Sequence, residues 1–210
     1  EIKELLKMTN RMKKILAIGF GTILVAFVAN NAMAAESAVW TTLNVSGGVA
    51  DNVTLNVQEE LRFGDITDLS LAEQRTKLSL GFGVNEMVGV SAGYLNTSSG
   101  EHRPFVGLAM ALLRGGVNID SASAIELSGF DTLSGRTSLT ASAVVNGLTL
   151  DLSDEVRLNE DGLIHNRASL GVTRSVTSNV AVNMYYMLNS TGTDLSSTAH
   201  IIGLGLGVSL

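Results

Sequence analysis

An alternation of apolar and small polar side chains, repeating every two residues, limits the folds open to this chain. It is clearest over residues 202–210, near the C-terminus. The apolar half there is Ile202, Leu204, Leu206, Val208 and Leu210, and the other half is Gly203, Gly205, Gly207 and Ser209. Because strand side chains alternate between the two faces of a sheet, one face is apolar and the other carries almost no side-chain atoms. Gly and Ser suit the interior of a narrow closed barrel better than the wet face of a soluble sandwich.

The same period continues through the chain beyond Ala35. The predicted strands are 39–48, 53–63, 76–85, 88–96, 104–113, 117–128, 136–145, 148–158, 166–175, 180–189 and 200–210. We therefore predict an all-β fold, a closed antiparallel up-and-down transmembrane β-barrel of about ten to twelve strands. Single-chain bacterial barrels have even strand numbers and both termini on the periplasmic side, so one of the eleven ranges should be spurious or one strand missed. The range least supported by the pattern is 117–128, whose apolar face includes Ser121 and Ser123.

Turn residues separate the predicted strands. Asn146-Gly147 is a strong signal for a type I′ hairpin, and 84–87 and 177–179 are similarly tight. Longer polar connections are expected at 64–75, 97–103, 159–165 and 190–199. Short turns at one end and longer loops at the other match the periplasmic and extracellular ends of an outer-membrane barrel.

Composition agrees with a membrane protein that crosses by strands. Hydrophobic residues make up 45% of the chain and charged residues only 16%. Outside the N-terminus no apolar run approaches the roughly 18 to 20 residues of a transmembrane helix. The chain contains no Cys, which excludes disulfides and thiolate metal or redox sites.

Residues 1–34 are predicted to be a cleavable secretory signal peptide, with Met8 and Met12 as candidate initiators. Basic residues precede an apolar run from Ile15 to Ala29, and Ala32-Met33-Ala34 fits cleavage before Ala35. The alternative is an uncleaved membrane anchor. We predict that residues 35–210 form the barrel in the bacterial outer membrane.

The predicted mature chain is acidic. It holds nine basic and eighteen acidic residues, a net charge of −9, which argues against nucleic acid as a partner. Expected partners are outer-membrane lipids and the barrel assembly machinery, the latter through strand 200–210. The oligomeric state is left open.

Two segments have the same pattern at an offset of 95 residues: Val53–Phe63 and Leu148–Leu158. We infer a duplication, with two halves of about five strands each. Within these segments, charged residues fall on the polar face and are expected in the lumen. With a later arginine, the candidates for a lumen charge network are Glu60, Arg62, Asp151, Glu155, Arg157 and Arg167. Such charges are more often a structural network than a selectivity or ligand site, and both interpretations remain open.

Glu59 and Asp154 fall on the apolar face instead. A lipid-facing carboxylate at mid-depth is costly, so these residues should lie near an interface or follow a β-bulge that changes the register.

Several short motifs resemble a family of bacterial outer-membrane barrels known only as a domain of unknown function. They are Trp40, Gly93-Tyr94, Glu101-His102-Arg103, residues 154–158, residues 166–172, Tyr185-Tyr186-Met187 and His200-Ile201-Ile202. The resemblance spans most of residues 39–210. It implies an outer-membrane barrel and no established biochemical activity.

No motif for catalysis stands out. His102, His165 and His200 lack metal-ligand spacing on one element, although a shared rim site formed in space is an alternative. No G-x-S-x-G elbow or phosphate-binding loop is present. We expect no catalytic residue, cofactor or metal, and a non-enzymatic barrel that is either a narrow pore or a structural and surface-interaction protein. The alternatives are a rim-active lipid hydrolase or acyltransferase, and a secreted soluble β-sandwich.

Overall fold

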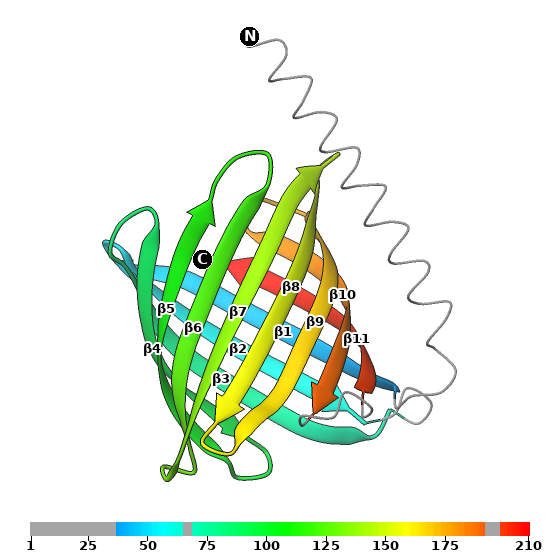
Figure 1. Ribbon diagram of the computed structural model, residues 1–210. Helices are drawn as coiled ribbons and strands as arrows, with labels where there is room; N and C mark the ends of the chain where they lie inside the picture. Colours follow the sequence, from blue (N-terminus) through cyan, green and yellow to red (C-terminus); the bar gives the residue numbers. More distant parts are fainter. Residues whose placement is uncertain (1–36, 65–68, 192–197) are drawn as a thin grey trace.

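The structure is a computed structural model that describes residues 37–64, 69–191 and 198–210. Within these ranges the chain forms eleven β-strands (Figure 1). They are β1 (Ser37–Ala50), β2 (Val53–Phe63), β3 (Leu71–Gly83), β4 (Val88–Thr97), β5 (His102–Leu113), β6 (Asn118–Ser128), β7 (Thr132–Val145), β8 (Leu148–Asn159), β9 (Gly162–Ser175), β10 (Val180–Thr191) and β11 (Thr198–Ser209). The predicted signal peptide lies outside the described residues.

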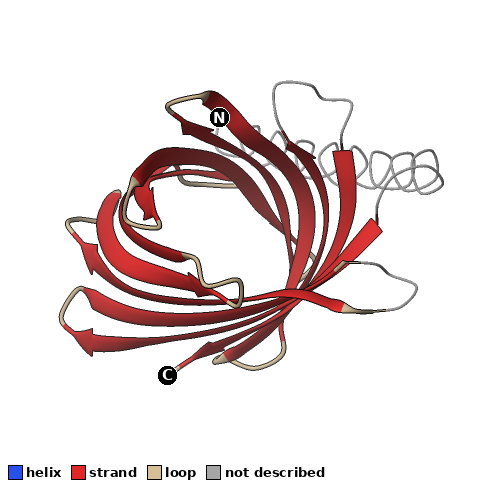
Figure 2. Cartoon of the chain, turned by 90° about the horizontal axis from the view of Figure 1, so that it is seen from below, coloured by secondary structure: helices blue, strands red, loops and turns tan. Residues whose placement is uncertain are grey.

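The strands form a closed barrel, as predicted. Each strand pairs with its neighbours in the chain, and β1 also pairs with β11. Figure 2 looks along the barrel and shows the strands arranged in a ring. Because every strand has a neighbour on both sides, the sheet has no free edge of unpaired N–H and C=O groups.

The closing pair corrects the expectation of an even strand number. Range 117–128 is a true strand, β6, which pairs with β5 and β7 along its length. The described strands therefore number eleven, and β1 and β11 are parallel, with Ser37 opposite His200 and Ser46 opposite Ser209. As a result, the start of β1 and the end of β11 lie at opposite ends of the barrel, and the expectation of both at one end is wrong. A parallel ladder of evenly spaced hydrogen bonds closes the sheet without a twelfth strand.

The connections lie at the two ends of the barrel, and those that are described in full are two to four residues long at both ends. One end, which we call the turn end, holds residues 51–52, 84–87, 114–117, 146–147 and 176–179. The hairpin prediction is confirmed there, since Asn146 and Gly147 have φ values of +52° and +77°, both positive as a type I′ turn requires. The opposite end, the loop end, includes residues 98–101, 129–131 and 160–161 among its described connections.

Three predicted loops are shorter than expected, and the one at 97–103 reduces to 98–101. Residues 159–165 reduce to a turn at Glu160 and Asp161, and β3 begins at Leu71 rather than at residue 76. The added strand residues include Glu73 and Arg75, which are polar and resemble a loop in the sequence. They are accommodated in a strand because they face the polar interior of the barrel.

Most of the large apolar side chains in the described ranges lie on the outside. On β3, Leu78 and Leu80 are each 51% exposed and Phe82 is 48% exposed. The apolar residues buried in the described ranges are few: Trp40, Phe105, Ala111, Ala143 and Ile201. This is the reverse of a soluble domain, in which such side chains would fill a core. No helix in the described ranges is long and apolar enough to cross a membrane.

Glu59 and Asp154 keep the register of their strands and lie among outward-facing residues. Glu59 accepts hydrogen bonds from Gln74 Nε2 at 2.5 Å and Thr76 Oγ1 at 2.7 Å. Asp154 accepts one from Asn166 Nδ2 at 3.1 Å. The β-bulge nearest Glu59 follows it, between Arg62 and Phe63, so a bulge does not explain its position. Both carboxylates lie near the middle of their strands and are hydrogen-bonded to polar neighbours, so the expectation that they lie near an interface is not supported by their positions.

We expect Gly93→Ala to destabilise the barrel by about 1–3 kcal/mol, the usual range for overpacking. A Cβ at Gly93 would lie 2.7 Å from Ser79 Cβ and would collide with the Leu78 carbonyl and the Phe105 ring. Urea-induced unfolding of the refolded barrel in detergent micelles measures the effect. Gly135→Ala is the matched control, because its new Cβ would meet no atom within 4 Å. Equal stability of the two variants would contradict the packing at Gly93.

Candidate functional site

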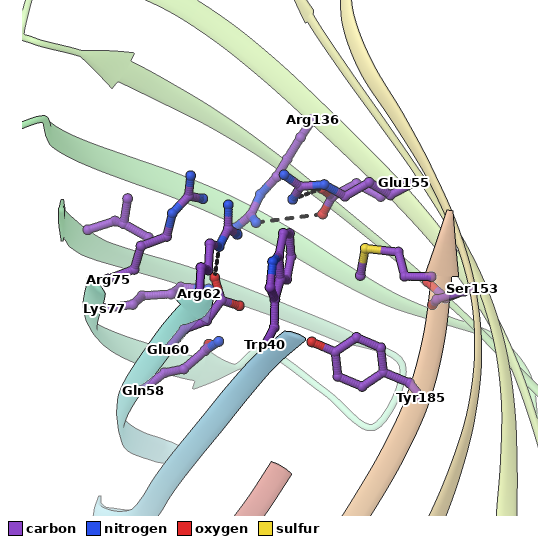
Figure 3. Close-up of a pocket in the computed structure, with 14 residues that line it drawn as sticks. Trp40, Gln58, Glu60, Arg62, Arg75, Lys77, Arg136, Ser153, Glu155 and Tyr185 are labelled. Atoms are coloured by element: carbon purple, nitrogen blue, oxygen red, sulfur yellow. Dashed lines mark hydrogen bonds and ion pairs between the residues drawn. The ribbon is translucent and has the colours of Figure 1, made fainter. Parts of the chain in front are cut away.

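A cavity of about 230 Å³ lies inside the barrel (Figure 3). Its wall combines residues from strands all around the barrel. The lining residues are Trp40, Gln58, Glu60, Arg62, Arg75, Lys77, Leu95, Arg136, Ser153, Glu155, Arg167, Ser169, Tyr185 and Met187. Five of these are basic and two are acidic, so the cavity has an excess of positive charge.

On β2 and β3, charged residues two positions apart share the inner face. Arg62 Nε lies 2.5 Å from Glu60 Oε1, and Arg62 Nη1 lies 3.4 Å from Glu73 Oε2. Arg75 Nε approaches the same Glu73 oxygen at 2.6 Å. Glu73 therefore serves two arginines, and one side of the lumen is a continuous chain of ion pairs.

On β8, Glu155 contacts basic groups from both neighbouring strands. Its carboxylate lies 3.4 Å from Arg167 Nη1 and 3.3 Å from His165 Nε2, both on β9. Arg136 Nη1 of β7 is 3.7 Å away. Removing this one carboxylate would leave several basic groups without their shared partner.

Glu126 of β6 extends this second chain of ion pairs. It lies 3.0 Å from Arg136 Nε and 3.0 Å from Arg157 Nη2. Arg157 also donates to Ser134 Oγ at 2.9 Å and is 8% exposed. The charges on β6, β7, β8 and β9 are thus connected through Arg136 and Glu155.

Trp40 of β1 contacts both of these chains of ion pairs. The Arg62 guanidinium carbon lies 3.6 Å from the centroid of the indole ring, and that of Arg167 lies 5.3 Å from it. Both distances are within cation–π range, and Trp40 is only 6% exposed. We call the whole set the lumen charge ring: Trp40, Glu60, Arg62, Glu73, Arg75, Lys77, Glu126, Arg136, Glu155, Arg157 and Arg167.

Lys77 differs from the other basic members of the ring. Its ammonium lies 4.9 Å from the centroid of the Phe105 ring. Phe105 is buried, and Gly93 leaves room for its ring against the wall. Across the described ranges, Lys77 forms no ion pair with a carboxylate. It therefore faces the cavity as a cation without a fixed counter-charge.

The candidates from the sequence fall into three groups. Glu60, Arg62, Glu155 and Arg167 line the cavity together. Arg157 belongs to the ring but does not line the cavity. Asp151 lies apart, with its nearest hydrogen bond from Thr173 Oγ1 at 3.4 Å.

Sequence reasoning missed several members of the site, notably Trp40, Arg75, Lys77 and Arg136. Lys77 lies within the predicted strand 76–85, and extending that strand toward the N-terminus by the same two-residue alternation would have added Arg75. Trp40 joins through Arg62 of the adjacent strand β2 and Arg167 of β9. Arg136 joins through Glu126 and Glu155 of the two strands that flank β7, and the sequence carries no local signal for these contacts.

The three histidines occupy separate places. His102 Nδ1 lies 2.6 Å from the Tyr94 hydroxyl, and His200 Nδ1 is hydrogen-bonded to Tyr186 in the same manner. His165 faces Glu155 inside the barrel. Across the part of the chain that the structure describes, no group of three His, Cys, Asp or Glu residues could hold a metal ion.

At the loop end, Glu101 precedes β5 and bonds to Arg103 and Ser128. The hydrogen bond from Arg103 is the main cause that lowers the pKa of the Glu101 carboxyl. Glu101 therefore remains ionised at neutral pH and contributes to the charged loop-end rim.

Comparison with known proteins supports the fold. A family model described as "Protein of unknown function (DUF2490)" matches residues 37–196. A solved structure of the NanC porin aligns with a TM-score of 0.56 and 11% identity, over 80% of this chain and 91% of that chain. A loop-deletion mutant of OmpT, an outer membrane protein of Vibrio cholerae, aligns with a TM-score of 0.42 and 14% identity, over 77% and 60% of the two chains. No curated protein matches the chain. The first of these alignments shows a shared barrel fold.

We expect Glu155→Gln to lower the free energy of unfolding by about 3 kcal/mol, because the change leaves partly buried cations without their shared carboxylate. Asp154→Asn is a matched control on the outer face of the same strand and should change it by about 0.5 kcal/mol or less. Urea unfolding of both variants in the same micelles measures the difference. A Glu155→Gln barrel as stable as the control would mean that the ion pairs contribute little.

Proposed function

This chain belongs to the DUF2490 family of proteins of unknown function, and from its own geometry we propose that it is an outer-membrane barrel that forms a narrow channel for small anions. The observation that carries the proposal is the charge of the cavity. Five basic and two acidic residues line it. Residues 35–210 as a whole are acidic, with a net charge of −9, so the positive lumen is not a reflection of overall composition.

The outer face supports a membrane location. Its band of half-exposed apolar residues would contact acyl chains, and the closed ladder leaves no strand edge to satisfy. Tyr94 and Tyr186, each bonded to a histidine, lie toward the loop end on the outward face. Aromatic side chains with a polar tip are enriched where a barrel meets the membrane interface. The signal peptide predicted from the sequence agrees with export to the outer membrane.

The lumen charge ring is the narrow part of the proposed channel. Long basic side chains and Trp40 fill the lumen at the level of the ring. Nearer the turn end, a cavity of about 380 Å³ is lined by small residues such as Gly89, Ala109 and Ala122, together with the carboxylates of Glu86 and Asp120. A basic constriction between low-dielectric walls concentrates the positive potential and favours anions.

The alternative function is enzymatic: a lipid hydrolase with its active site at the rim of the barrel. It would need a serine hydroxyl within hydrogen-bond reach of a histidine. The histidines are hydrogen-bonded to Tyr94, Tyr186 and Glu155 instead, so we propose a non-enzymatic barrel. Membrane insertion through strand 200–210 by the assembly machinery remains a prediction.

We expect the refolded barrel to conduct in planar bilayers with a reversal potential, under a KCl gradient, that indicates preference for chloride. Lys77→Glu changes the charge of the ring by two and should lower the chloride-to-potassium permeability ratio severalfold. Arg174→Gln is the control, because this arginine is exposed and lies opposite Val182 on the outward face. No conductance, or a preference for potassium in the unmodified barrel, would contradict the proposed channel.

A further inference from the structure

We propose that the cavity is a binding site for a small oxyanion of the phosphate class, with two negative charges, held by Lys77, Arg75 and Arg136. The inference deepens the proposed function, since it places the ligand in the same cavity. Binding itself does not require that the channel conduct, so the two claims can be tested separately.

The charge of the ring sets the charge of the ligand. The six basic members are Arg62, Arg75, Lys77, Arg136, Arg157 and Arg167, and the four acidic members are Glu60, Glu73, Glu126 and Glu155. The excess is two positive charges in a partly enclosed space. Uncompensated charge away from bulk water is costly, so a dianion at this position would be favoured over a monoanion.

Because the carboxylates of the ring are shared between basic groups, the excess positive charge is concentrated on a few of those groups. Glu73 serves both Arg62 and Arg75, and Lys77 has no carboxylate partner in the described ranges. Arg136 divides its contacts between Glu126 and Glu155, at 3.0 and 3.7 Å. The under-compensated groups are therefore Lys77 and Arg75 of β3 together with Arg136 of β7. Figure 3 shows the basic side chains of β3 and β7 extending into the same cavity.

The chemistry and size of the cavity agree with a small oxyanion. Guanidinium groups present paired N–H donors that match phosphate and carboxylate oxygens, and an ammonium adds a compact point charge. A volume of about 230 Å³ is below the roughly 300–1,000 Å³ of pockets for drug-sized ligands. The site therefore suits a phosphate-sized ion or the charged head of a larger solute that passes through the lumen.

Titration of the refolded barrel in a neutral detergent with inorganic phosphate tests the site. The midpoint of thermal unfolding should rise and saturate, because a ligand that binds only the folded state stabilises it by mass action. Sodium chloride at equal ionic strength should not reproduce the rise, and acetate, a monoanion, should be weaker. Phosphatidic acid with short acyl chains tests a lipid headgroup as the source, and we expect the free ion alone to bind because the site lies inside the barrel.

Lys77→Gln should weaken phosphate binding by about tenfold or more, because it removes a charge-assisted contact. Lys77→Arg keeps the charge and should retain most of the affinity, and Arg174→Gln should retain all of it. If Lys77→Gln fails to fold, loss of the effect in Lys77→Met with retention in Lys77→Arg gives the same test. A Lys77→Gln barrel with unchanged phosphate affinity would overturn the proposal.

The remaining outcomes separate the site from the channel. A saturable phosphate effect that depends on Lys77, in a barrel that does not conduct, supports the site while the channel fails. An anion-selective conductance with no phosphate effect overturns the site and leaves the channel. Equal stabilisation by acetate and phosphate overturns the assignment to a dianion.

Discussion

Closure of the hydrogen-bond ladder is the constraint on which the rest of this structure depends. In an apolar medium each unsatisfied backbone N–H or C=O costs several kcal/mol, so a strand edge cannot remain open there. The parallel pairing of β1 with β11 removes both edges at once. Only after closure do the two faces of the sheet become an outside and an inside, with apolar side chains on one and charged or small side chains on the other.

Closure also explains the lumen charge ring. Side chains that point inward cannot all reach bulk water, so carboxylates and basic groups on neighbouring strands pair with one another. The two segments of similar pattern, Val53–Phe63 and Leu148–Leu158, show that the pairing is not fixed by local sequence. Arg62 pairs with Glu60 two residues away, whereas its counterpart Arg157 pairs with Glu126 of β6. The difference follows from the neighbours that each strand meets around the barrel.

The sequence predicts the faces of the strands better than it predicts their ends or partners. A two-residue period assigns Glu60, Arg62, Glu155 and Arg167 to the inner face without any knowledge of the fold. The same period has no information about which strand closes the barrel, and that choice decides the parity of the strand number. Residues 73–76, near the start of β3, resemble a loop because both faces of the strand are polar there. Trp40 and Lys77 acquire their roles only through contacts with Arg62, Arg167 and Phe105.

The central claim is that one face of each strand contacts lipid while the other encloses a charged interior. Single spin labels at consecutive positions of β3 test it directly in a chain without native Cys. In vesicles, labels at Leu78 and Leu80 should collide with dissolved oxygen from the bilayer. A label at Ser79 should respond to a water-soluble nickel reagent from the lumen. The same aqueous accessibility at all three positions, or a refolded chain that does not associate with vesicles, would contradict the account.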